Sequence, residues 1–257
     1  MNIKILGAHT NESLNTECIS LLIDDVLALD AGGLTSSLSF SDQGKLRAIL
    51  LTHRHWDHVK DVRTLASYLY YRLGGTINVY SIPSVGDFLS HLVQICNPSG
   101  DLMERPPENP AVKFTEIELL KTQQIEGYSV LAVPVNHQVP TVGYQVTSPD
   151  GKVVFYTGDT GPGLANCWER ISPQMLFIEA TVPNRLEERV RLAGHLTPGL
   201  LKQELISFRE VKGYLPQVVI VHLDPLFEEE IKAEIAAVAE DLNHPISVGY
   251  EGMELHL

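Results

Sequence analysis

The sequence predicts an α/β protein with an αββα four-layer sandwich, in which two stacked β-sheets are covered by helices on both outer faces. Three observations support this fold class. Short strand-like apolar runs fill the first third of the chain and return after residue 112. Each β-rich half also carries segments with helical spacing. No repeat, low-complexity tract or linker divides the 257 residues, and 44% of them are apolar, so we expect a single domain over 1–257.

Strands in the first half are short apolar runs bounded by polar or glycine-containing turns. They are expected at residues 3–6, 18–23, 26–30, 46–52 and 77–80. Helices are expected at residues 34–40, 59–71 and 84–95. In the second of these, Val62, Leu65 and Leu69 share one helical face, and a pair of glycines stops the pattern. The Pro-rich segment 97–110 is a loop that could serve as a lid, an oligomer contact or a plain exposed connection.

The second half repeats this mixture of strands and helices. Strands are expected at residues 128–135, 142–147, 152–157, 175–179, 217–222, 246–250 and 253–257. Helices are expected at residues 197–209 and 226–242. Pro198 suits the first turn of the earlier helix, and acidic residues at the start of the later one complement its dipole.

Composition excludes several classes of protein. A formal net charge of −13 argues against an extended nucleic-acid partner but allows a small anionic substrate, because bound metal ions can outweigh the global field. Cys18, Cys96 and Cys167 are too far apart for a zinc motif and are expected to be buried free thiols. No apolar run approaches the roughly 20 residues that cross a bilayer, and no signal peptide is evident. We therefore expect a cytoplasmic protein without membrane contact.

The most informative segment is His53-Arg54-His55-Trp56-Asp57-His58, which directly follows the strand expected to end at Thr52. It places four potential metal ligands within six residues. Open α/β sheets carry their chemistry at such strand ends. Side chains crowded this tightly would suffer mutual repulsion and desolvation, and a bound cation is the usual solution.

Three further strands end in a residue suited to bind metal. His137 follows the strand at 128–135, Asp159 follows 152–157, and His222 follows 217–221. One such histidine is more often structural, but four strand ends of this kind in one chain predict a metal centre. Imidazole and carboxylate ligands suit zinc, and also iron or manganese.

These motifs resemble the metallo-β-lactamase fold superfamily, in which H-x-H-x-D-H, an isolated His, an Asp and a final His occur in this order. The resemblance implies two divalent metal ions, zinc first, held by His53, His55 and His137, by Asp57, His58 and His222, and by a bridging Asp159. A hydroxide between the two ions would be the nucleophile. Asp57 would orient or deprotonate it. Thr52 and Asp61 are candidate hydrogen-bond partners of the ligand histidines.

Two later segments narrow the reaction. F-I-E-A-T (177–181) and A-G-H-L-T-P (193–198) resemble ribonuclease Z. Together with L-D-A-G (29–32) and T-G-D-T-G-P (157–162), they are closer to the class II 3′,5′-cyclic-nucleotide phosphodiesterases. This implies hydrolysis of a small anionic phosphodiester, above all a 3′,5′-cyclic nucleotide, and a homodimer. His195 and Glu179 would form an acid dyad at the substrate phosphate.

Three alternatives stay open. A ribonuclease Z-like nuclease usually carries a tRNA-gripping arm between the isolated His and the bridging Asp, but His137 and Asp159 are only 22 positions apart. A diiron redox or oxygen-binding protein typically has Glu in place of the second motif histidine, whereas His55 is intact here. A metal-binding protein without turnover would not need His195.

Other candidates carry weaker arguments. His9 could contact substrate, but a loop histidine without a catalytic role fits equally, and His91, His244 and His256 are expected to be structural or exposed. Asn136 and Thr160 neighbour predicted ligands and could tune them. A tyrosine cluster, which could wall a base pocket but more simply forms a helix packing face, comprises Tyr68, Tyr70 and Tyr71. Trp56 occupies a motif position where the class II phosphodiesterases usually have Leu.

Overall fold

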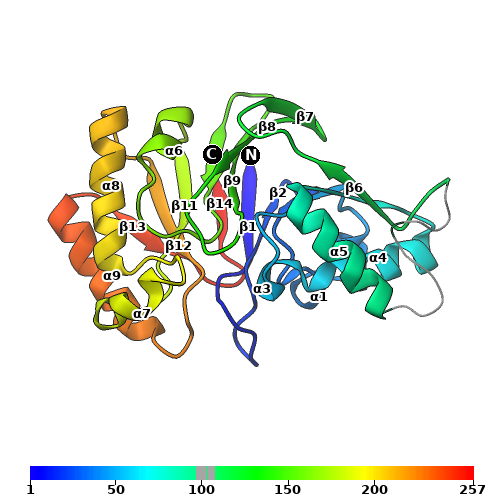
Figure 1. Ribbon diagram of the computed structural model, residues 1–257, viewed down its shortest axis with the longest axis horizontal. Helices are drawn as coiled ribbons and strands as arrows, with labels where there is room; N and C mark the ends of the chain where they lie inside the picture. Colours follow the sequence, from blue (N-terminus) through cyan, green and yellow to red (C-terminus); the bar gives the residue numbers. More distant parts are fainter. Residues whose placement is uncertain (97–102, 104–107) are drawn as a thin grey trace.

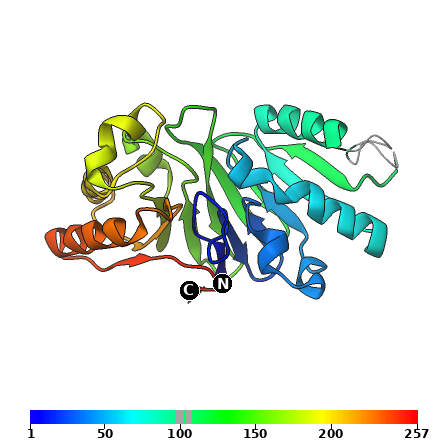
Figure 2. The same ribbon diagram turned by 90° about the horizontal axis from the view of Figure 1, so that it is seen from below.

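Two stacked seven-stranded β-sheets form the centre of the protein, and helices cover their outer faces (Figures 1 and 2). This computed structural model describes residues 1–96, 103 and 108–257. The predicted α/β four-layer sandwich is confirmed. Most of the loop expected at 97–110, and with it the question of a lid, lies outside the described residues, as does the side chain of Cys96.

The first sheet contains mostly the N-terminal strands, with the last strand of the chain at one edge. Its order is β14 (Glu254–His256), β1 (Asn2–Gly7), β2 (Ser20–Ile23), β3 (Leu27–Leu29), β4 (Ala48–Leu50), β5 (Ile77–Ser81) and β6 (Val112–Glu116). Strands β3 to β6 run parallel to one another. The pairing of β1 with β14 brings the two termini side by side (Figure 1).

The second sheet contains the later strands. Its order is β13 (Ile246–Val248), β12 (Gln217–Val221), β11 (Met175–Glu179), β10 (Val153–Tyr156), β9 (Val142–Thr147), β8 (Tyr128–Pro134) and β7 (Thr122–Ile125). Strands β10 to β13 are parallel, and β8 runs in the same direction because two antiparallel steps separate it from β10. The carboxyl ends of β8, β10, β11 and β12 therefore meet at one edge of this sheet.

Helices flank each sheet on its outer side, as both views show. Beside the first sheet lie α1 (Leu34–Ser37), α2 (Phe40–Gln43), α3 (Trp56–Val59), α4 (Asp61–Tyr68), a π-helical turn (Leu69–Leu73) and α5 (Pro83–Cys96). Beside the second lie α6 (Ala165–Arg170), a 3₁₀ turn (Asn184–Leu186), α7 (Glu187–Arg191), α8 (Pro198–Lys212) and α9 (Glu228–Leu242). Among the helices that the structure describes, none combines the length and apolarity that a membrane-spanning helix needs.

Two sequence-based boundaries were wrong for identifiable reasons. The helix predicted at 34–40 is two short helices, because the Ser39 side chain accepts a hydrogen bond from the backbone N–H of Asp42 and starts α2. The helix predicted at 59–71 begins earlier, at Trp56, inside the histidine motif, and ends in a π-helical turn before Gly74. Strand β7 and helices α6 and α7 were not predicted.

Alternate side chains of β11 enter two different cores. Met175 and Phe177 pack in the core shared by the two sheets, whereas Leu176 and Ile178 face α6, α8 and α9. The apolar run M-L-F-I is thus explained by a strand buried on both faces, which is typical of parallel sheets covered by helices. This burial fixes the register of β11 and places Glu179, the last residue of the strand, at the sheet edge.

Replacing Phe177 by Ala should lower the free energy of unfolding by about 3–5 kcal/mol, because a fully buried aromatic side chain leaves a cavity between the sheets. Urea unfolding of the metal-free protein measures the change. The matched control is Leu192→Ala, at a side chain that is 87% exposed, which should change stability by less than about 0.5 kcal/mol. Equal effects of the two substitutions would contradict this placement of the core.

Candidate metal centre

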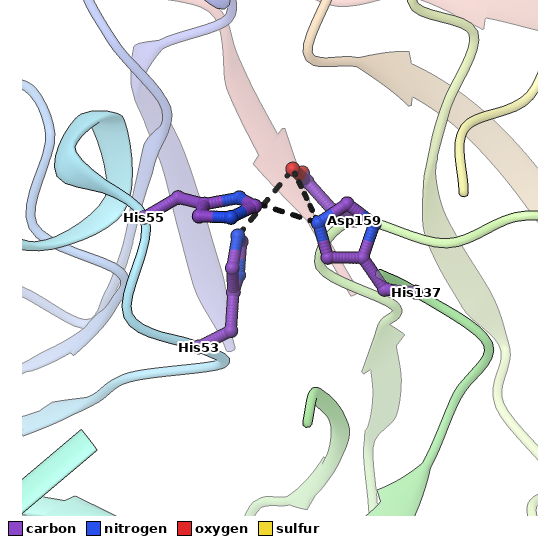
Figure 3. Close-up of side chains that lie close together, drawn as sticks. All are labelled: His53, His55, His137 and Asp159. Atoms are coloured by element: carbon purple, nitrogen blue, oxygen red, sulfur yellow. Dashed lines mark hydrogen bonds and ion pairs between the residues drawn. The ribbon is translucent and has the colours of Figure 1, made fainter. Parts of the chain in front are cut away.

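The predicted metal-binding residues converge where the strand ends of the two sheets face one another. His53, His55, Asp57 and His58 follow β4, and His137 follows β8. Asp159 follows β10, and His222 follows β12. Residues as many as 169 positions apart in the sequence, His53 and His222, thus belong to the same cluster. Figure 3 shows His53, His55, His137 and Asp159 pointing toward a common centre.

The first group consists of these four side chains, whose candidate ligand atoms all lie within 4.8 Å of one another. His53 Nε2 and His137 Nε2 lie 3.5 and 3.8 Å from Asp159 Oδ2. His137 Nε2 lies 3.3 Å from His55 Nδ1. Three imidazole nitrogens and one carboxylate oxygen therefore surround a single point, which is the arrangement of a four-coordinate metal site.

The second group contains Asp57, His58 and His222. Asp57 Oδ2 lies 3.1 Å from His222 Nε2 and 3.5 Å from His58 Nε2. The other oxygen of Asp159, Oδ1, lies 3.1 Å from His58 Nε2 and 3.3 Å from His222 Nε2. Because Oδ2 faces the first group and Oδ1 faces the second, Asp159 lies between them, as expected of a bridging ligand.

The chemistry of these side chains fits a metal ion. His53 Nε2, His58 Nε2 and Asp159 Oδ1 are buried and have no hydrogen-bond partner among the described residues. Unpaired buried polar atoms of this kind cost free energy, and a cation coordinated by them would remove the cost. The donors are imidazole nitrogens and carboxylate oxygens, so the cluster is able to bind metal.

Hydrogen bonds around the cluster leave the Nε2 lone pair of each of four histidines free for a metal. Thr52 Oγ1 donates to Asp30 and therefore accepts the Nδ1 proton of His53, at 3.0 Å. Asp30 Oδ2 accepts the Nδ1 proton of His58 at 2.7 Å. His137 donates from Nδ1 to the carbonyl of Gly194 at 2.8 Å. Such bonds fix the tautomer and the orientation of a metal-binding histidine.

The Nδ1 atom of His222 is also held by a hydrogen bond, made by a residue that follows β11 of the second sheet. Thr181 Oγ1 donates to Glu179 Oε2 and accepts the Nδ1 proton of His222 at 3.0 Å. Thr52 was predicted as a partner of a ligand histidine, and its hydroxyl lies there. The same expectation for Asp61 was wrong: its carboxylate accepts from the Thr35 N–H at 2.7 Å and pairs with Lys60.

Sequence reasoning assigned no role to Asp30 or Thr181. The available signal was position, because Asp30 directly follows β3 and Thr181 lies two residues beyond the end of β11. Both are therefore at the same edge as the predicted ligands. Their partners, His58 and His222, come from other strand ends.

The charges of the cluster favour a bound cation. Burial lowers the pKa of His53 well below its ordinary value, which keeps the ring in the neutral form that binds metals. Burial also opposes protonation of His58, but the carboxylates of Asp159, Asp57 and Asp30 together raise its pKa well above the usual value. Without a metal ion, these three carboxylates would hold a proton on His58 in its place.

His195 lies beside the cluster and is bound to Glu179, as predicted for this pair. His195 Nδ1 is 2.9 Å from Glu179 Oε1, and the two rings of His195 and His222 stack with centroids 5.6 Å apart. Burial opposes protonation of His195, but the charge and hydrogen bond of Glu179 raise its pKa to about 9. Fully buried Glu179 also accepts from the backbone N–H groups of Thr160 and Leu196.

Two glycines allow the loops to approach this closely. Gly158 precedes Asp159 with a φ of +63°, and a Cβ there would lie 2.7 Å from the Thr52 side chain. Gly194 has a φ of +75°, and a Cβ there would lie 2.9 Å from the Cα of His137. The glycines of T-G-D-T and G-H-L-T-P are therefore required by backbone geometry as well as by space.

The remaining candidates lie outside the cluster or beside it. His9 is buried between Glu251 and Glu228, with Nδ1 2.6 Å from Glu251, so it links backbone segments. His91 and His256 are exposed, and His244 bonds the carbonyl of Pro216. The Asn136 N–H donates to Thr160 Oγ1, which joins two ligand loops. Tyr68 stacks on Phe40 at 4.8 Å, as expected of a packing face.

The family of the chain follows from its sequence as well as its geometry. The sequence model of the Beta-lactamase superfamily domain matches residues 21–237. The chain belongs to this superfamily. The resemblance to metallo-β-lactamase fold proteins inferred from the histidine motif is thereby confirmed, and the four-layer sandwich agrees with it.

Three proteins illustrate the range of its relatives. An octanoyltransferase of Porphyromonas gingivalis is 27% identical over 224 residues, which are 84% of this chain and 39% of that protein. A ribonuclease Z of Staphylococcus carnosus is 27% identical over 165 residues, 60% of this chain and 52% of that protein. The chain thus spans about half the length of these curated relatives, or less. The crystal structure of unliganded yeast PDE1 shares the fold, with a TM-score of 0.85 and 16% identity over 100% of this chain and 99% of that one.

Replacing Asp30 by Asn should weaken metal binding about 10- to 100-fold, because the substitution removes the carboxylate that holds His58 while preserving shape. Asn also tolerates the positive φ of this position. Competition with a chelator measures zinc affinity. The matched control is Asp25→Asn, an exposed aspartate that also has a positive φ and should bind zinc like the unaltered protein. Unchanged affinity in the Asp30 variant would show that this hydrogen bond does not support the site.

Proposed function

We propose that the protein is a metal-dependent phosphodiesterase that hydrolyses a small anionic phosphodiester, with a 3′,5′-cyclic nucleotide as the preferred candidate. The observation that carries the proposal is the position of His195. A histidine bound to a buried carboxylate lies next to a cluster able to bind metal, with its Nδ1 4.0 Å from Asp159 Oδ2. A metal site of purely structural or storage function would not need such an additional acid.

The seven-residue cluster would hold two divalent ions, zinc being our first choice and iron or manganese also compatible. His53, His55, His137 and Asp159 would bind one, and Asp57, His58, His222 and Asp159 the other. When bound, such ions polarise the phosphoryl oxygens and lower the pKa of water, which supplies a nucleophile at neutral pH. Asp57 has a side chain that is 24% exposed, so its carboxylate can orient the attacking water and accept its proton.

His195 would act on the other side of the phosphorus. Glu179 accepts the Nδ1 proton, so the Nε2–H is the one that His195 can donate. A phosphodiester gains negative charge on its oxygens as it is attacked, and the leaving alkoxide needs a proton. The cationic imidazole can stabilise that charge and protonate the leaving oxygen. Glu179 would keep the ring charged and oriented.

The choice of a small substrate rests on the chain between His137 and Asp159. Residues 135–141 and 148–152 connect β8, β9 and β10, and all of them are described without an inserted arm. The net charge of −13 also disfavours a long polyanion. Similarity to a ribonuclease Z and a fold shared with yeast PDE1 both support phosphodiester chemistry. A tRNA-processing nuclease is therefore the second candidate, and intact His55 argues against the diiron redox alternative.

Removal of metal should abolish hydrolysis of cyclic AMP, cyclic GMP and bis(p-nitrophenyl) phosphate, and added zinc, manganese or iron should restore it, because the nucleophile depends on the ions. Metal analysis of the purified protein, coupled to product assays, measures both effects. His55→Ala should lose metal and activity together. Processing of pre-tRNA 3′ ends without turnover of these three diesters would favour the nuclease instead.

Replacing His195 by Ala should keep the bound metal yet lower turnover by about 10²–10⁴-fold, the usual contribution of a general acid. The assay is kcat together with metal content on the same sample. His244→Ala is the matched control, because this histidine is also partly buried and hydrogen-bonded but lies away from the cluster. It should retain full activity. Full activity of the His195 variant would remove the observation on which the proposed function rests.

A further inference from the structure

Trp56 is an unusual residue at the edge of the metal centre. It is the first residue of α3 and directly precedes Asp57, yet its side chain is 56% exposed. The indole therefore presents a large flat surface that a ligand beside the candidate metal centre could contact.

A pocket of about 410 Å³ opens beside this indole. Its walls are the segment 10–12 between β1 and β2, together with Cys18, Trp56, Asp57 and Lys60. The volume lies within the range of small-molecule sites, about 300–1,000 Å³. Because Asp57 belongs both to the pocket and to the metal cluster, the pocket adjoins the place where a phosphate would bind.

The charges in the pocket disfavour a second phosphate. The Lys60 ammonium is 2.7 Å from the Glu12 carboxylate and 3.1 Å from that of Asp61, so two acids already surround the single base. Asp57 is the second carboxylate of the lining, beside Glu12. The pocket therefore favours an uncharged group that donates hydrogen bonds, and Glu12, whose side chain is 59% exposed, is available to accept them.

Covalent chemistry does not explain the pocket. Cys18 is the one thiol in its lining. It is buried, and burial together with the charge of Asp57 raises its pKa to about 11, so it stays protonated at neutral pH. The lining of the pocket therefore offers no reactive thiolate.

A second, smaller pocket flanks the cluster at His137. Its volume is about 270 Å³, and its lining is mainly aliphatic, including Ile82, Leu119 and Val139. The one aromatic ring among its lining residues is that of His137, a candidate metal ligand and therefore not a free surface for stacking. Of the two pockets, only the one at Trp56 combines a flat aromatic surface with an acceptor for amino groups, which is what a nucleobase requires.

We propose that the pocket at Trp56 is the nucleobase subsite, in which the base of the substrate stacks on the indole and donates an amino hydrogen to Glu12. The inference deepens the proposed phosphodiesterase function, since it makes a nucleoside phosphodiester the substrate class. The phosphate would lie on the metal cluster, and the base would lie in the pocket between the segment 10–12 and α3. A base that carries an exocyclic amino group fits best.

Kinetics of Trp56→Ala test the subsite. With a 3′,5′-cyclic nucleotide, kcat/KM should fall about 10-fold or more, as expected for loss of base stacking. With the same cyclic ribose phosphate lacking a base, it should not change. Leu119→Ala, in the other pocket, is the control and should leave the preference for the base-bearing substrate intact. Equal losses on both substrates at equal metal content, or no loss on either, would overturn the subsite.

Fluorescence tests the subsite even if no diester is hydrolysed, which would refute the proposed function alone. The chain has two tryptophans, and the other, Trp168, is fully buried. Guanosine 5′-monophosphate should quench the emission saturably in the metal-loaded protein, whereas ribose 5-phosphate should not. Trp56→Phe should abolish the quenching, because it leaves Trp168 as the emitter. Absence of quenching in the unaltered protein would show that no base stacks on Trp56.

Discussion

The position of one buried carboxylate, Asp159, determines most of what surrounds it. Its two oxygens face two separate groups of imidazoles, and the buried Oδ1 lies 3.1 Å from His58 Nε2 and 3.3 Å from His222 Nε2. Burying these polar groups so close together costs free energy, and a bound cation would offset that cost. Four strand ends, those of β4 in the first sheet and of β8, β10 and β12 in the second, therefore meet within a few ångströms, and the sandwich positions them by burying both faces of its parallel strands.

Two residues of the site have strained backbone conformations. Asp30 and His222 both have a φ of 59°, in the left-handed region that residues other than glycine rarely adopt. Each therefore costs free energy that the rest of the structure must offset. At both positions, the unusual φ turns the side chain at the end of the strand toward the cluster. Asp30 reaches His58, and His222 reaches Asp57 and Asp159.

Features encoded by neighbouring residues could be predicted from the sequence, and features that depend on distant partners could not. Strand β11 and the histidine motif are local patterns. Helix α6, in contrast, starts where the backbone N–H groups of Gly163 and Leu164 donate to Glu204, a residue about 40 positions later. The same holds for the residues that hydrogen-bond to the candidate ligand histidines. Thr52 neighbours His53 and was found, whereas Asp30 and Thr181 act on histidines 28 and 41 positions away and were missed.

Glu179 connects the two parts of the site that have different chemical roles. Its Oε1 holds His195, and its Oε2 accepts the Thr181 hydroxyl, which in turn fixes His222. One buried carboxylate at the end of β11 therefore sets both the angle of the candidate acid and the tautomer of a candidate ligand. Backbone N–H groups of Thr160 and Leu196 hold that carboxylate in place. The candidate acid and one candidate metal ligand are thus linked through the same strand end, so the spacing between His195 and His222 depends on the position of Glu179.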